Sequence, residues 1–195
     1  LLDVAQANGM GPLRSNTVAF GWPGRPERLE EMLRVLRWLE RLGKAALLLR
    51  PRPEEGPQRF ERIDVWWRGK QNNGDLMLLL GHLLTLNPQW RQAELTLRSI
   101  VTSEAGRGDM DRGLKELLES IRIPAARDVI VKPPELTVYQ VMQQTSRDAD
   151  LVFIGLMPPE EGQEADYARR LAELVADLPT TVLVRNGGPF RGKLL

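Results

Sequence analysis

Apolar runs of strand length alternate with amphipathic helical segments along most of the chain, and this alternation limits the possible folds more than any other feature. After residue 62, five such runs are separated by four segments with apolar residues at helical spacing. The strands are predicted at 63–67, 94–101, 128–132, 151–156 and 180–185, and the helices at about 75–87, 110–122, 136–147 and 164–178. Mostly apolar strands are typical of parallel pairing between two helical layers. We therefore predict a doubly wound, mainly parallel α/β fold with right-handed crossovers.

The first fifty residues contain fewer elements of the same kind. Strands are predicted over Thr17–Gly21 and Ala45–Leu49, with an amphipathic helix between them that begins at Pro26 and ends before Gly43. Two strands and one helix are too few to bury a core. This part therefore either packs on the later half or forms the end of another α/β unit.

These patterns divide the chain into four segments. Residues 1–50 are interpreted as the C-terminal part of a first α/β unit, and residues 51–61, with three prolines, as a linker. Residues 62–187 form the second unit, and residues 188–195 form a tail. The opening stretch LLDVAQANGMG has the pattern of a helix end, so we expect the sequence to be a piece of a longer polypeptide.

Composition argues against several classes of function. The 27 basic and 26 acidic residues nearly cancel, whereas nucleic-acid binders carry a basic excess on one face. With no cysteine and a single histidine, His82, the chain has no disulfide, no thiolate site and little basis for a metal site. No pair of carboxylates and no nucleophile with a base suggests catalysis. We therefore expect no enzyme activity, no metal and no nucleic-acid partner.

A glycine loop after the first strand of the second unit raises the possibility of a phosphate site. Gly69 and Gly74 are separated by four residues, as in a P-loop. That loop continues with Lys and Ser or Thr, but here Asp75 and Leu76 follow. A carboxylate near the start of a helix repels phosphate, so the stretch is predicted to be a structural loop and helix cap.

A second phosphate loop could follow the fourth strand of that unit, as in universal stress proteins that bind ATP. Gly155 is present there, but Pro158, Pro159, Glu160 and Glu161 occupy the loop. Prolines lack amide donors and glutamates repel phosphate. No ATP or other cofactor is therefore expected.

Aromatic and leucine side chains are concentrated around the glycine loop. Trp66 and Trp67 are adjacent in a strand, so they are predicted to face opposite helical layers and to pack in the core. The following helix carries Leu or Met on more than one side over residues 76–86. Such a helix must be covered from more than one direction, which indicates a contact surface for another domain or subunit.

Several motifs in the right order resemble the cytoplasmic C-terminal domain of cation-chloride cotransporters. IDVWW, a glycine-containing loop, a leucine-rich helix and then Trp90 are similar to that family, as are DLVFIGLMPPE and TTVLVRNGG near the end. GMGPLRSNTVAFGWP resembles an upstream family motif. The positions that match are Asn16, Thr17, Gly21, Trp22, Pro23, Asp64, Trp66, Trp67 and Gly74. The loop over residues 68–75 is basic and amide-rich where the family is acidic, and long regulatory insertions are absent, which indicates a prokaryotic member.

The resemblance implies a non-catalytic cytoplasmic domain for regulation and dimerisation of a transporter that moves chloride with sodium or potassium. It implies two α/β units resembling universal stress proteins, without ATP. A membrane domain would precede residue 1 in the same polypeptide, in the plasma (inner) membrane, and the partner would be a second copy. The alternative is a soluble universal-stress-type protein that binds a nucleotide in the crevice offered by such sheets.

Overall fold

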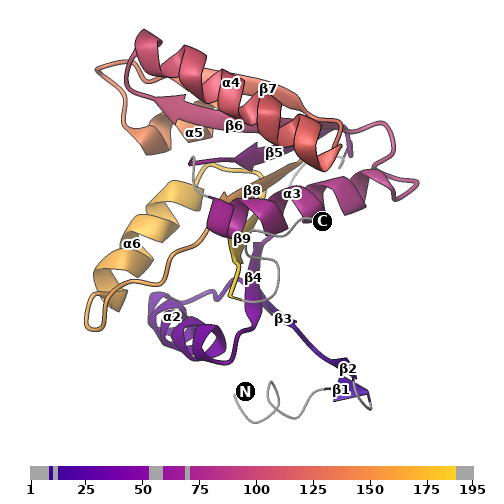
Figure 1. Cartoon of the computed structure of the whole chain (residues 1–195). Coiled ribbons are helices and arrows are strands. Elements are labelled where there is room, and N and C mark those ends of the chain that lie inside the picture. The colour runs from indigo at the N-terminus through magenta and orange to yellow at the C-terminus, as the bar shows by residue number, and fades with distance from the viewer. Residues whose placement is uncertain (1–8, 11–12, 53–58, 69–70, 188–195) are drawn as a thin grey trace.

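The structure is a computed structural model that describes residues 9–10, 13–52, 59–68 and 71–187. Its main feature is a seven-stranded sheet with the strand order β3-β4-β9-β8-β5-β6-β7 (Figure 1). The strands are β3 (Thr17–Gly21), β4 (Ala45–Arg50), β5 (Arg62–Trp66), β6 (Glu94–Val101), β7 (Ala126–Val131), β8 (Leu151–Gly155) and β9 (Thr180–Arg185). The helices are α2 (Pro26–Arg41), α3 (Gln71–Thr85), α4 (Glu104–Ile121), α5 (Val138–Thr145) and α6 (Glu164–Val175). A separate two-stranded hairpin joins β1 (Gly9–Met10) to β2 (Leu13–Arg14).

The predicted doubly wound α/β fold is confirmed for the second part of the chain. Strands β5 to β9 are parallel and lie in the order β7-β6-β5-β8-β9. The chain therefore winds outward from β5 in one direction to β7, and then returns to β8 on the other side of β5. This reversal between β5 and β8 is a topological switch point, where open α/β sheets form their ligand crevices.

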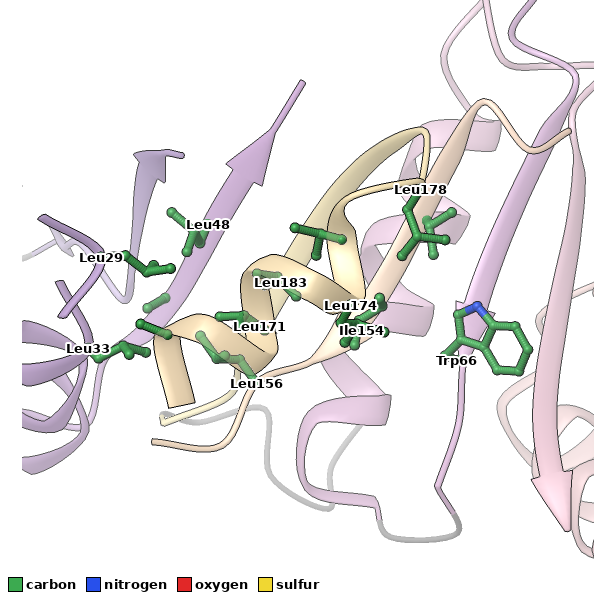
Figure 2. Packing of buried hydrophobic residues seen from close by; sticks show 14 of the residues in the cluster. Leu29, Leu33, Leu48, Trp66, Ile154, Leu156, Leu171, Leu174, Leu178 and Leu183 are labelled. Atoms are coloured by element: carbon green, nitrogen blue, oxygen red, sulfur yellow. The ribbon is translucent and has the colours of Figure 1, made fainter. Parts of the chain in front are cut away.

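Helices cover the two faces of the sheet in two layers (Figure 1). Helices α2, α5 and α6 pack over one face, and their apolar side chains form one core with Trp66, Leu48 and Leu183 (Figure 2). Helices α3 and α4 pack over the other face, and their core includes Trp67. The two tryptophans are buried on opposite faces, at 5% and 6% exposure, as their adjacency in the strand predicts.

Residues 17–50 join the same sheet through β3 and β4 instead of forming a separate layer. Strand β4 pairs antiparallel with β9, and β3 pairs parallel with β4 at the edge. The core under α2 and α6 is continuous, because Leu29, Leu33 and Leu36 of α2 belong to the same cluster as Leu171 of α6. The antiparallel β4–β9 ladder is therefore the seam between the two parts of the chain.

Two strand–helix–strand segments, β3-α2-β4 and β8-α6-β9, are arranged alike on either side of this seam. In each, the residue after the first strand donates its amide to a carbonyl of the second strand. Trp22 N donates to Leu49 O and Leu156 N donates to Val184 O, both at 2.7 Å. Leu48 lies opposite Leu183 at the centre of the β4–β9 ladder. The two segments are thus related by an approximate twofold axis through the seam.

Two helix starts differ from the sequence prediction. Helix α4 begins at Glu104, six residues before the predicted position of 110, and Ser103 caps it by accepting the amide of Gly106 at 3.2 Å. Helix α3 begins at Gln71 instead of near residue 75, so Asp75 lies one turn inside it. Among the helices formed by the described residues, none is both long and apolar enough to cross a membrane.

Candidate functional site

The switch point between β5 and β8 is the position where the fold would place a ligand. The loop after β5 leads into α3, and the loop after β8 leads toward α6, so their ends meet at the same edge of the sheet. In doubly wound sheets a nucleotide lies in this crevice, against the start of a helix. The side chains at this edge therefore decide whether the fold can hold one.

Asn73, in the first turn of α3, occupies the crevice. Its Nδ2 donates to the carbonyl of Leu156, after β8, at 2.9 Å, and its Oδ1 accepts the amide of Asn186, after β9, at 2.9 Å. The side chain is 9% exposed. Gly155, at the end of β8, faces it so closely that an added Cβ would lie 3.1 Å from Asn73 Nδ2. One side-chain amide thus links the ends of three elements, with both its nitrogen and its oxygen bonded to the protein itself.

Gly74 follows Asn73 and packs against the ring of Trp67. A Cβ at residue 74 would come within 2.5 Å of three carbons of that ring, so only glycine fits without displacing the indole. This glycine therefore serves close packing between helix and strand instead of approach to a phosphate. Gly69 and Lys70, which belong to the same loop, lie outside the described residues.

The start of α6 is also occupied by the protein's own carboxylate. Glu164, buried at 4% exposure, accepts the amide of Gly162 at 2.8 Å and pairs with Arg37 of α2. Hydrogen bonds from backbone amides, first that of Glu164 itself, and the bond from Arg37 hold the pKa of this carboxyl below its ordinary value. The positive end of the helix that a phosphate would use is therefore already neutralised.

A buried polar network lies beneath the crevice, on the α5 face of the sheet. Trp66 Nε1 donates to Ser146 Oγ at 3.0 Å, and Ser146 Oγ donates to Asp64 Oδ2 at 2.7 Å. Arg98 on β6 places its Nε 2.9 Å from the same oxygen and also pairs with Asp128 on β7. Asp64 is 2% exposed, and its burial raises the pKa of its carboxyl above the ordinary value despite these partners.

The positions that match the cotransporter motifs fall into two separate groups in the structure. Asp64, Trp66, Trp67 and Gly74 come together around β5 and the start of α3. The other positions, Asn16, Thr17, Gly21, Trp22 and Pro23, lie along edge strand β3 and the turn after it. The sequence motifs thus mark two structural regions and do not form a single site.

Sequence reasoning missed Asn73, Ser146 and Arg98. The local pattern around Asn73 predicts only a loop, because the backbone groups that its side chain bonds lie 83 and 113 residues away in the chain. Ser146 and Arg98 carry no local signal, because their partners lie 82 and 34 residues away in the chain. Within the described part of the chain, no group of three or more His, Cys, Asp or Glu side chains could hold a metal.

Comparison with known proteins places this fold among the universal stress protein-like folds. No protein-family model matches the sequence. The cytoplasmic domain of a prokaryotic cation chloride cotransporter is similar in structure, with a TM-score of 0.69 and 21% identity over 96% of this chain and 68% of that one. A universal stress protein from Archaeoglobus fulgidus has a TM-score of 0.59 and 12% identity, over 95% of this chain and 65% of that one. This chain thus spans about two thirds of the length of each.

Proposed function

We propose that this chain is a non-catalytic cytoplasmic domain that regulates and dimerises a membrane cation-chloride cotransporter. The observation that carries the proposal is the filled crevice at the switch point. The side-chain amide of Asn73 donates to the carbonyl of Leu156 and accepts from the amide of Asn186, and Trp67 lies against Gly74. A nucleotide-binding relative would need open space at this place. The structural similarity to a cotransporter's cytoplasmic domain supports the same interpretation.

The same observation weighs against the alternative, a soluble nucleotide-binding protein of the universal stress type. Phosphate would need free backbone amides at the start of α3 or α6. The carboxylate of Glu164 already takes the Gly162 amide at α6, and Arg37 neutralises that carboxylate. Binding of a phosphate at the start of α6 would therefore require the Glu164 carboxylate to move.

We further propose that residues 1–50 belong to the end of a first α/β unit and residues 62–187 to a second. The approximate twofold axis supports this division, because β3-α2-β4 repeats the arrangement of β8-α6-β9. In the second unit, β8 has β5 as its outer neighbour and α6 has α5 beside it, with Gln143 of α5 donating to the carbonyls of Glu173 and Leu174. The equivalent places, the outer edge of β3 and the exposed Trp38 and Leu42 of α2, are where the rest of a first unit would pack.

Cell fractionation tests the transporter assignment directly. Antibodies raised against this chain should detect, in the source cells, a polypeptide much larger than 22.1 kDa that stays in the membrane fraction after washing with alkaline carbonate. Detection of a free 22.1 kDa protein in the soluble fraction would refute the assignment.

Calorimetry on the purified chain tests the alternative. Titration with ATP, ADP and AMP should give no heat of binding, because the crevice is filled. Saturable binding of any of the three at micromolar concentration would favour the nucleotide-binding alternative. An Asn73→Ala variant serves as a control, since it removes the side chain that occupies the crevice and shows whether this side chain alone excludes the ligand.

A further inference from the structure

We propose that the uncharged outer face of α3, carrying Leu79, Leu83 and Leu86, is the surface on which two copies of this chain meet about a twofold axis. The inference rests on the dimerisation role in the proposed function and assigns it a surface. Leu83 is 51% exposed and Leu86, one residue beyond the helix end, is 62% exposed. Large apolar side chains at such exposure, spaced three and four residues apart, form one stripe along a helix.

The opposite side of α3 is fully used within the chain. Leu76, Met77 and Leu78 are buried at 3% or less, and Gly81 lets the helix approach the sheet so closely that an added Cβ would lie 2.9 Å from Leu95 Cδ1. Part of the apolar excess that the sequence placed on this helix is therefore covered by the chain's own sheet. The remainder includes the exposed Leu83 and Leu86. Helix α3 itself lies on the same side of the sheet as α4 (Figure 1).

The composition of this face distinguishes it from the rest of the surface. No Asp, Glu, Lys or Arg occurs from Leu76 to Trp90, although these residues make up 27% of the chain. The neighbouring helix α4, in contrast, carries eight charged residues among its 18. Depletion of charge beside exposed apolar side chains is typical of the centre of a protein–protein interface.

The lack of charge favours a second copy as the occupant. At a twofold contact each residue near the axis meets a copy of itself or of its neighbour, so a charged residue there meets like charge. The face of α3 avoids this repulsion. The exposed Trp38 of α2 does not, because Arg34 and Arg41 lie one turn away on either side of it and Arg41 lies over its ring at 4.9 Å.

The association state of the complete 195-residue chain tests the proposal. Sedimentation velocity over a range up to high micromolar concentration should show a reversible dimer for the unmodified protein. The double variant Leu83→Glu, Leu86→Glu should raise the dimer dissociation constant by about a hundredfold or more, because it buries charges near the axis. The control Val138→Glu changes a residue that is 44% exposed on α5 and should leave the dissociation constant within about threefold of the unmodified value.

Cross-linking provides a second readout that does not depend on the folding of a charged variant. Because the chain has no cysteine, single substitutions Leu83→Cys, Leu86→Cys and Val138→Cys each introduce one thiol per protomer. A disulfide needs Cα atoms about 4.4–6.8 Å apart, so oxidation should yield a covalent dimer from residue 83 or 86 and none from residue 138.

The possible failures are distinguishable. A dimer that persists unchanged in the double variant, with no cross-link from residue 83 or 86, overturns the assigned surface and leaves the transporter proposal intact. A strict monomer at high micromolar concentration overturns both the surface and the dimerisation role. Membrane fractionation of the larger polypeptide tests the transporter assignment independently of either result.

Discussion

Replacement of Gly74 by alanine tests whether this glycine is kept for packing against Trp67. The added Cβ would come within 2.5 Å of three ring carbons. Because the optimal carbon–carbon separation is about 3.5–4.0 Å, the ring would have to retreat by at least ~1 Å. Trp67 is 6% exposed and belongs to the core under α3 and α4, so it has little space in which to move.

The expected magnitude follows from two opposing contributions. Overpacking of a well-filled core costs about 1–3 kcal/mol, whereas alanine in a helix is favoured over glycine by up to about 1 kcal/mol. The net effect should be a loss of up to about 2 kcal/mol in the free energy of unfolding. Urea titration followed by far-UV circular dichroism measures this difference.

Gly113 on α4 provides the matched control. It is exposed and also lies inside a helix, and a Cβ added to it would have no neighbouring atom within 4 Å. Gly113→Ala should therefore stabilise the protein by about 0.5–1 kcal/mol through helix propensity alone. A second variant, Trp67→Leu, should remove most of the penalty of Gly74→Ala in a double-mutant cycle. If Gly74→Ala stabilises the protein as Gly113→Ala does, the packing explanation is wrong.

Three further predictions concern polar contacts, and denaturant titration measures all of them. Asn73→Ala should cost about 1–3 kcal/mol, because a backbone amide and a carbonyl at the crevice lose their partner. Arg98→Met should cost about 3–5 kcal/mol at neutral pH, because Asp64 stays buried without its cation. Burial raises the pKa of Asp64, so the native state keeps the proton on this carboxyl to higher pH than the unfolded chain does. The free energy of unfolding of the unmodified protein should therefore fall, relative to that of Asp64→Asn, as the pH rises from about 3.8 through the raised pKa. Arg50→Met should cost about 1–2 kcal/mol, because the Arg50 guanidinium donates to two carbonyls after α6, each at 2.9 Å. The control Arg112→Met removes an exposed ion pair with Asp109 and should cost less than about 0.5 kcal/mol.

Local patterns in the sequence predicted most of the elements. The strands over Thr17–Gly21, Glu94–Val101 and Thr180–Arg185 have the predicted ends. Thr137 and Gln140 have the three-residue spacing of a capping box, and both hydrogen bonds of the box form, at 3.2 and 2.8 Å. Each of these signals is contained within a few neighbouring residues, which is why the sequence alone reveals it.

The start of α4 was missed because its first turns are poor in helix-forming residues. Gly106, Gly108 and Gly113 lie within this helix, and glycine is among the least favourable helix residues. The Ser103 cap supplies one of the missing hydrogen-bond partners at the helix start, and Leu114 and Leu118 anchor the other end in the core. Tertiary packing thus extends this helix beyond the limit that local propensity sets.

The crevice is closed to a phosphate for a different reason in the structure than the one the sequence suggests. The sequence predicts no phosphate site because the negative charge of Asp75 is expected at the start of the helix. In the structure Asp75 lies one turn inside α3, and the crevice is closed by the Asn73 side chain and by the contact between Gly74 and Trp67. A side chain's bonds to backbone groups 83 and 113 residues away leave no trace in the local pattern.

The seam between β4 and β9 gives the strongest reason why the segment β3-α2-β4 is stable in this chain. Leu48 and Leu183 pair at its centre, and two arginines reach across it in opposite directions. Arg50 donates to carbonyls after α6, and Arg185 pairs with Glu40 of α2. Because each side of the seam thus supplies a contact to the helix of the other side, β3-α2-β4 shares its core with β8-α6-β9. The approximate twofold axis, which no local motif predicts, is therefore the feature through which β3-α2-β4 obtains its packing partner.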